Sequence, residues 1–257
     1  MMHLSRVNTL RLIVLVAFVL FWEVSVQSGL ANPFWISSPS KIAIRAVELM
    51  GGGVLFHHLG VTLLEAFSGL VAGTVAGVLL GIVLGSSRIV GQVVEPFIMA
   101  INSLPRVALA PLLVMYVGIG FASKFLLAFS LVVVIVMVNT FEGVRAVDPT
   151  LVNAMRILGA GRMQLFRMVL LPNSVPWILA GVRVSVSFSI VGAIVGEFIS
   201  ARAGIGFLID RASGAYDTTG IMVPLLTLML CAVVIDFLIV RLTSYLLRWR
   251  VSRMQST

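Results

Sequence analysis

The chain has 257 residues, of which 60% are hydrophobic and 11% charged, and its formal net charge is +8. This composition excludes an ordinary soluble domain, because so much apolar surface needs lipid to cover it. The positive charge would indicate nucleic acid in a soluble protein, but here the basic residues flank apolar runs, where they orient membrane spans, so we expect no nucleic-acid partner. The single cysteine, Cys231, lies in an apolar run and is interpreted as a packed residue.

The N-terminal apolar run has the length of a signal-peptide core. No convincing small-x-small cleavage site follows it, so residues 1–30 are predicted to hold an N-terminal cytoplasmic end and an uncleaved first span. Residues 31–56 are then an external, periplasmic segment. Within it, Ser37 to Met50 has the spacing of an amphipathic helix, with Ser40 as its candidate cap.

Glycine recurs at every fourth position of the second apolar run, about residues 57–84 and just beyond. These glycines are Gly69, Gly73, Gly77, Gly81 and Gly85. In water such a row would weaken a helix, whereas in a membrane small residues at this spacing let another helix backbone approach closely. The second span is therefore predicted to lie centrally in a helix bundle.

Four more spans are predicted, at about residues 91–118, 122–141, 175–198 and 220–245. The first of these contains Pro105 and Pro111, each of which removes a backbone donor and favours a kink. Residues 246–257 form a basic tail that is predicted to be cytoplasmic.

Six spans place both termini on one side of the membrane, and charge indicates which side. With the N-terminus inside, ten basic residues are cytoplasmic: Arg6, Arg11, Arg88, Arg145, Arg156, Arg162, Arg167, Arg248, Arg250 and Arg253. Five are external: Lys41, Arg45, Lys124, Arg202 and Arg211. The positive-inside rule therefore favours cytoplasmic termini and a cytoplasmic location for residues 148–172.

Residues 148–172 are neither a plausible span nor an obviously solvated loop. Asp148 followed by Pro149 is typical of a helix N-cap and first helical position, and the glycines of Gly159 to Gly161 favour a sharp change of direction. Pro172 is predicted to end the second of two short helices. Their arginines lie off the apolar stripe, so an interfacial helix on anionic headgroups is one interpretation.

The second interpretation comes from resemblance. Ala154, Gly159 and the run from Val169 to Pro172 resemble the EAA motif, EAA-x3-G-x9-I-x-LP, of permease subunits of binding-protein-dependent ABC importers. The motif implies a cytoplasmic coupling helix that fits a groove on the ATP-hydrolysing subunit. Asn153 and Met155 replace the Glu and the second Ala of the motif. The coupling residues that the resemblance implies are Asn153, Ala154, Met155, Gly159, Arg162, Val169, Leu171 and Pro172.

Short motifs in a shared order make about residues 38–245 similar to the nitrate/sulfonate/taurine branch of these permeases. The resemblance implies an all-α integral membrane protein with six transmembrane helices of the type I ABC importer permease kind. Its core would be residues 57–245, with the coupling element at 148–172. It also implies an inner-membrane homodimer that carries two ATPase subunits and receives solute from a periplasmic binding protein. Arg106 departs from the branch, which commonly has a second proline there.

The chain contains no GxxxxGK[ST] phosphate loop. ATP and Mg²⁺ are therefore expected on the partner ATPase, with no cofactor and no enzymatic activity in this chain. A secondary transporter or channel for a small anion is the alternative function; it predicts inverted repeats, and no repeat links the two halves. A membrane-embedded enzyme would need a clustered nucleophile, acid/base pair or metal set, and none appears.

Charged residues inside spans usually face a bundle interior or a water-filled cavity. They are Glu23, Glu65, Arg106, Arg183, Glu197, Asp236 and Arg241. Arg106 follows a proline beside Asn102 and Ser103, and Ser187 lies one turn beyond Arg183. We hypothesise that the two arginines border a route for a small anion such as a sulfonate, nitrate or an organic acid. The alternative is that Arg183 reaches the cytoplasmic interface and pairs with a carboxylate.

Two further patterns remain open. Glu197 and Asp210 flank Arg202 and Arg211 around a glycine-containing external segment, which indicates either a gate or re-entrant turn, or mutual neutralisation on the surface. The adjacent histidines His57-His58 point about 100° apart on a helix, so we expect no metal site.

Overall fold

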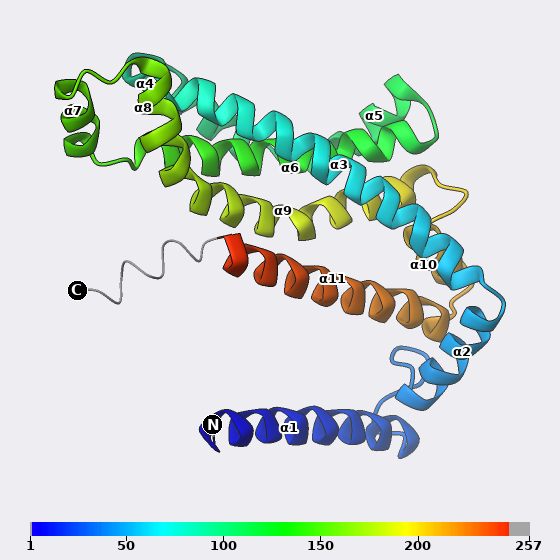
Figure 1. Ribbon diagram of the computed structural model, residues 1–257. Helices are drawn as coiled ribbons and strands as arrows, with labels where there is room; N and C mark the ends of the chain where they lie inside the picture. Colours follow the sequence, from blue (N-terminus) through cyan, green and yellow to red (C-terminus); the bar gives the residue numbers. More distant parts are fainter. Residues whose placement is uncertain (1, 247–257) are drawn as a thin grey trace. The chain divides into compact units, whose positions relative to one another are not determined.

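The computed structural model describes residues 2–246, and over this range every regular element is helical (Figure 1). In chain order the helices are α1 (Met2–Gln27), α2 (Pro39–Gly51), α3 (Val54–Gly85), α4 (Arg88–Ser103), the 3₁₀ helix η1 (Arg106–Leu109), α5 (Ala110–Val117), α6 (Phe121–Arg145), α7 (Pro149–Ile157), α8 (Arg162–Leu165), the π-helix η2 (Phe166–Leu170), α9 (Leu171–Ser200), α10 (Ile205–Gly214) and α11 (Thr218–Leu246). The basic tail with Arg248, Arg250 and Arg253 lies outside the described residues.

The membrane spans confirm the predicted all-α, six-span class. Within residues 2–246, five helical segments are long and apolar enough to cross a membrane: Val7–Gln27, Val54–Gly85, Phe121–Arg145, Arg162–Ser200 and Thr218–Tyr245. A sixth span results if Ile89–Ser103 and Arg106–Val117, which are bent by 72° at a short break, cross as one. The break lies at Leu104 and Pro105, as the proline predicts. Pro111 does not produce a second kink, because it lies in the first turn of α5, where no N–H is needed.

The chain forms two compact units, residues up to 61 with 203–229 and residues 62–202 with 230 onward. We call these unit one and unit two, and describe each by itself.

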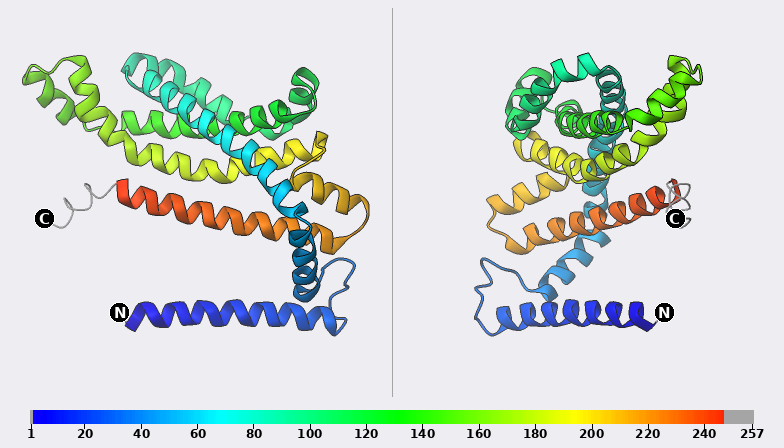
Figure 2. Two further views of the ribbon diagram at one scale, coloured as in Figure 1. Left: turned by 45° about the vertical axis from the view of Figure 1, so that its right-hand side comes forward. Right: turned by 90° about the vertical axis from the view of Figure 1, so that its left-hand side faces the viewer.

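Unit two is built on the close packing of α3 and α9 against α6 (Figure 2). A methyl group added to any glycine of the row in α3 would lie 2.5 to 3.0 Å from atoms of α6. From Gly69 to Gly85 the atoms met belong in turn to Ala128, Val132, Val133, Thr140 and Val144. The predicted close approach of a second helix is therefore confirmed, and α6 is that helix.

The other face of α6 packs as closely against α9. Gly181, Gly192 and Gly196 of α9 lie against Asn139, Ala128 and Lys124 of α6. Glycines of α3 and of α9 thus let both helices approach α6 closely.

In unit one, short polar contacts connect the segment before α2 to the start of α11. The hydroxyl groups of Ser37 and Thr219 are 2.7 Å apart, and the Phe34 carbonyl accepts a hydrogen bond from Thr218 Oγ1.

The cap of α2 differs from the prediction. Ser38, rather than Ser40, accepts from the Lys41 backbone N–H, because Pro39 occupies the first helical position.

Pro172 does not end a helix, contrary to the prediction. The helical path continues from Arg162 to Ser200, and the five-residue π-helix ends two residues before the proline. In that segment the N–H of Leu171 bonds to the carbonyl of Phe166. The widened turn shifts the hydrogen-bond ladder at the point where Pro172 has no N–H to offer, which explains how the helix passes through it.

Candidate functional site

The coupling element, residues 148–172, begins with the predicted cap. Asp148 Oδ1 accepts the Thr150 N–H at 2.8 Å, and Pro149 is the first residue of α7. This backbone hydrogen bond, assisted by the Thr150 side chain, holds the pKa of Asp148 below its ordinary value. Helix α7 ends at Ile157, and Gly159 follows with a φ of +80°, a conformation that favours glycine. Gln164 Oε1 accepts the Gly161 N–H at 2.9 Å at the start of α8.

The coupling element is exposed over most of its length and becomes buried towards its end. Asn153, Ala154, Gly159 and Arg162 are exposed, while Val169 is buried and Met155, Leu171 and Pro172 are half-buried. Large apolar side chains are exposed beside the motif: Ile157 is 86% and Leu158 81% accessible. An exposed apolar pair on a short helix outside the span is typical of a surface that another protein covers.

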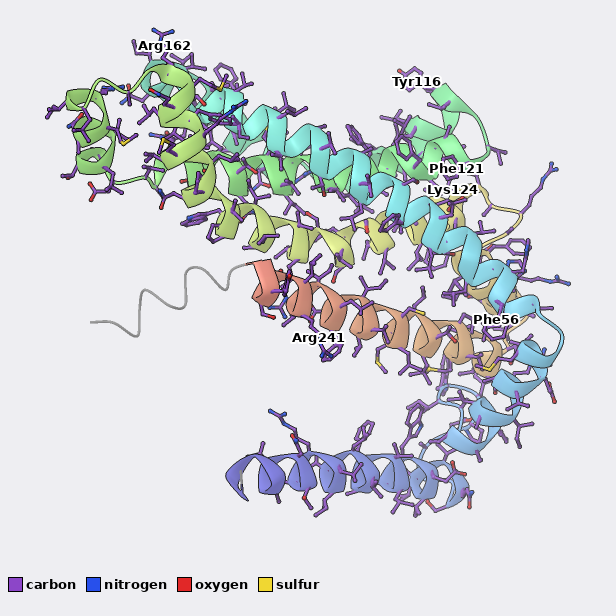
Figure 3. All side chains as sticks on the ribbon, in the orientation of Figure 1. Phe56, Tyr116, Phe121, Lys124, Arg162 and Arg241 are labelled. Atoms are coloured by element: carbon purple, nitrogen blue, oxygen red, sulfur yellow. The ribbon has the colours of Figure 1, made fainter. Side chains whose placement is uncertain are left out.

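The coupling element lies at one end of unit two. Helices α7 and α8 project beyond the ends of α6 and α9, while α5 lies at the opposite end (Figures 1 and 2). Figure 3 likewise places Arg162 at one end and Lys124 towards the other. Helix α8 leads through the π-helix directly into α9.

Arg106 lies at the break in the third span, but its guanidinium group is directed to backbone carbonyls. Nη1 donates to the carbonyls of Ser130 and Leu131 at 3.3 and 3.4 Å, and Nη2 donates to Asn102 Oδ1 at 3.3 Å. Nε is buried without a hydrogen-bond partner. Ser103 instead bonds to the Met99 carbonyl in its own helix. In the part of the chain that the structure describes, Arg106 has no ion pair. Its guanidinium group donates hydrogen bonds to neutral oxygen atoms alone.

Arg183 is held by a carboxylate. Its Nε and Nη2 donate to the two oxygens of Asp236 in α11 at 2.8 and 3.0 Å, a bidentate pair. Both side chains are about half exposed. Ser187, one turn further along α9, is exposed and takes no part in this pair. The observed partner favours the alternative that the sequence left open for Arg183, and the structure does not bring Arg183 and Arg106 together through any contact.

A buried charge cluster at the α3–α6–α9 junction was missed by the sequence reasoning. Lys124 Nζ lies 3.6 Å from Glu65 Oε1, and Thr62 Oγ1 donates to Glu197 Oε1 at 2.6 Å. All four residues are at most 4% accessible. Gly196 makes room for this arrangement, because a methyl group there would lie 2.7 Å from Lys124 Cγ.

The cluster corrects two expectations. Glu197 is not a surface residue neutralised by Arg202, because it is buried and bonded to Thr62. Lys124 was counted among the external basic residues, although its side chain is buried beside Glu65. Charged residues close to glycine in two predicted spans were the available signal, but local patterns do not indicate which of these residues meet.

One residue of the histidine pair, His58, contacts the segment that leads into α10 in unit one. His58 Nδ1 accepts the Gly204 N–H at 2.9 Å, and its ring stacks on Phe207 of α10 with centroids 5.7 Å apart. Gly204 has a φ of +119°, a conformation that favours glycine. The glycine-containing segment is therefore a turn that leads into α10.

Comparison with known proteins agrees with this geometry. A family model described as "Binding-protein-dependent transport system inner membrane component" matches residues 73–252. The riboflavin transport system permease protein RibX of Chloroflexus aurantiacus is 36% identical over 240 residues, which cover 93% of this chain and 90% of RibX. The taurine transport system permease protein TauC of Escherichia coli is 27% identical over 238 residues, which cover 91% of this chain and 86% of TauC.

A solved structure has the same fold. The inward-facing MetNI methionine ABC transporter aligns with a TM-score of 0.59 at 22% identity, over 72% of this chain and 91% of that one.

Proposed function

This chain belongs to the family of inner-membrane components of binding-protein-dependent transport systems, and from that membership we propose its role in detail. It forms the translocation pathway of an ATP-driven importer for a small solute that a periplasmic binding protein delivers. Two copies of the permease assemble with two ATPase subunits, which supply ATP, Mg²⁺ and hydrolysis. The single observation that carries this proposal is the exposed apolar surface of α7, at the end of the bundle where a partner has access to it.

The coupling element transmits the movement of the ATPases to the permease. Closure of the two ATPases on nucleotide draws the two coupling elements together. Helix α8 continues through the π-helix into α9, and α9 packs through glycines on α6. A displacement of the coupling element is therefore transmitted to the helix bundle. The bundles then open outward, receive solute from the binding protein, and return inward after hydrolysis.

The orientation proposed places the coupling element and both termini in the cytoplasm. The excess of basic residues on that side supports it. Because Lys124 lies towards the opposite end of unit two from Arg162, the buried charge cluster then lies towards the periplasmic side.

The solute is proposed to be a small anion such as a sulfonate, nitrate or an organic acid. Arg106 supports this, since no carboxylate balances its charge among the described residues, and the relative TauC is named for taurine. Arg183 gives no such support, because Asp236 already pairs with it. RibX is named for riboflavin, so relatives of this chain also carry larger organic solutes.

The test is uptake into proteoliposomes that contain the permease with its co-expressed ATPase and binding protein. Replacing the exposed pair by Ile157→Asp and Leu158→Asp is expected to lower binding-protein-stimulated ATP hydrolysis at least about tenfold, because apolar contacts at a protein interface are lost. Leu30→Asp, at a comparably exposed apolar residue of unit one, is the control and should leave coupling unchanged. Uptake that persists without any ATPase would instead establish a secondary transporter.

A further inference from the structure

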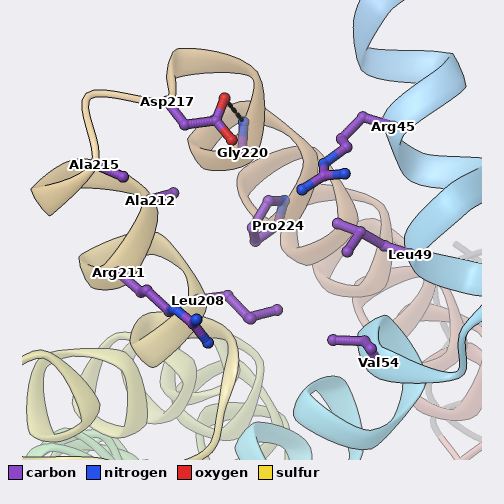
Figure 4. A pocket seen from close by; sticks show the side chains of 10 residues that line it. All are labelled: Arg45, Leu49, Val54, Leu208, Arg211, Ala212, Ala215, Asp217, Gly220 and Pro224. Carbon is purple, nitrogen blue, oxygen red and sulfur yellow. Dashed lines mark hydrogen bonds between the residues drawn. The ribbon is translucent and has the colours of Figure 1, made fainter.

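Unit one contains a cavity of about 340 Å³ with two arginines in its wall (Figure 4). Residues of α2, the start of α3, α10 and the start of α11 line it. Arg45 extends from α2 towards Pro224, and Arg211 extends from α10 beside Leu208. Leu49 adds an apolar side chain to the lining of the cavity. The cavity thus combines two guanidinium groups with an apolar interior.

The two arginines of the cavity are only weakly held by other groups of this chain. Arg45 Nη1 bonds to Glu48 Oε2 at 2.8 Å, within one exposed helix, where both side chains are about half accessible. Pairs of this kind are weak, so Arg45 exchanges partners at little cost. Arg211 is exposed and has no hydrogen bond or ion pair within residues 2–246.

Asp217 is the one carboxylate among the described residues that line the cavity, and it forms no ion pair with Arg45 or Arg211. Asp217 Oδ1 accepts the Gly220 N–H at 2.9 Å and so satisfies a backbone donor of the first turn of α11 (Figure 4). The two arginines therefore line a partly apolar space in which no lining carboxylate pairs with either of them. Guanidinium groups match carboxylates in a planar, bidentate geometry, and the volume accommodates one side chain or small molecule.

We propose that this cavity receives an acidic side chain of the periplasmic binding protein. The inference rests on the proposed function, which places α2 and α10 outside the membrane. The methylene groups of the acidic side chain contact Leu49 and Pro224. Its carboxylate bonds to Arg211 and displaces Glu48 from Arg45. Such a contact fixes the register of docking and makes association sensitive to salt.

The experiment measures the affinity of the binding protein for the permease–ATPase complex in lipid nanodiscs, at low and high salt. Arg45→Gln and Arg211→Gln are each expected to weaken binding about tenfold at low salt and to flatten its salt dependence. Glu48→Gln should act in the opposite direction and tighten binding a few-fold, because it removes the competing carboxylate. Arg202→Gln, at an exposed arginine that does not line the cavity, is the matched control and should leave affinity unchanged.

A second arm distinguishes a docked side chain from a free anion. Acetate and methanesulfonate are titrated into the complex without the binding protein. If either anion binds to the wild type but not to Arg45→Gln, while binding-protein affinity is the same in both, the cavity is a solute site and the docking proposal is wrong. Unchanged affinity in Arg45→Gln and Arg211→Gln also overturns it. ATP-dependent uptake by these variants at saturating binding protein would leave the proposed function standing.

Discussion

Lys124 Nζ and Glu65 Oε1 lie 3.6 Å apart, with side chains only 6% and 3% exposed. They join α6 to α3, and the second carboxylate, Glu197 on α9, lies in the same buried cluster. A charge buried this deeply is costly unless it is paired, so the three helices are tied together by groups that depend on one another. The glycine rows bring the backbones close enough for these side chains to meet.

Removing the ammonium group alone should destabilise the protein strongly. Lys124→Met leaves Glu65 buried without its cation, at a cost of about 3–5 kcal/mol. The double variant Glu65→Gln/Lys124→Met should recover much of that loss. Thermal unfolding of the purified protein in detergent measures both, with Lys41→Met at an exposed lysine as control. Equal melting temperatures for Lys124→Met and the wild type would contradict a paired buried cluster.

Variants of Arg183 and Asp236 test whether Arg183 only pairs with Asp236 or also contacts the solute. Since both are about half exposed and solvent screens their charges, Arg183→Asp should lower the melting temperature only slightly, through loss of the pair and repulsion by Asp236. The exchange Arg183→Asp/Asp236→Arg restores the pair with its charges reversed. We expect the exchanged protein to regain wild-type uptake and melting temperature. Uptake that stays low in a protein of normal stability would show that the arginine at position 183 itself contacts solute.

The glycine row should tolerate no side chain where it faces α6. A methyl group on Gly73 would lie 2.7 Å from Val132 Cβ and 3.1 Å from the backbone nitrogen of Val133, which cannot move aside. Gly73→Ala is therefore expected to cost about 1–3 kcal/mol by overpacking. Gly60→Ala in the same helix meets no atom within 4 Å and is the matched control. Thermal unfolding of the two variants side by side checks this; equal melting temperatures would mean that α3 and α6 lie further apart.

Features that depend on neighbouring residues were predictable from the sequence. The apolar runs, the glycine row, the break at Pro105 and the Asp148–Pro149 cap all follow from local patterns, and the structure shows each of them. The EAA-like motif led to the family, which the comparisons show.

Contacts between distant residues were not predictable. Thr62 and Glu197 are 135 positions apart, and the sequence does not state which helix faces bring them together. Arg183 had several possible carboxylate partners, and only the packing of α9 beside α11 selects Asp236. At Pro172 the local rule failed, because a π-helix accommodated a residue that usually ends a helix.

The cap of the coupling element should depend on pH. The folded-state pKa of Asp148 is lowered, chiefly by the Thr150 N–H, so its contribution to helix stability is fully present above the ordinary aspartate pKa and is lost as the pH falls through the lower folded value. We therefore expect amide hydrogen exchange in α7, corrected for its intrinsic pH dependence, to become faster below about pH 4. Asp148→Asn keeps a capping oxygen without a titratable group, so its α7 should be protected at neutral pH and insensitive to acid. Asp148→Ala should exchange faster at every pH. If the wild type and Asp148→Asn show the same acid response, a group other than Asp148 governs the stability of this helix.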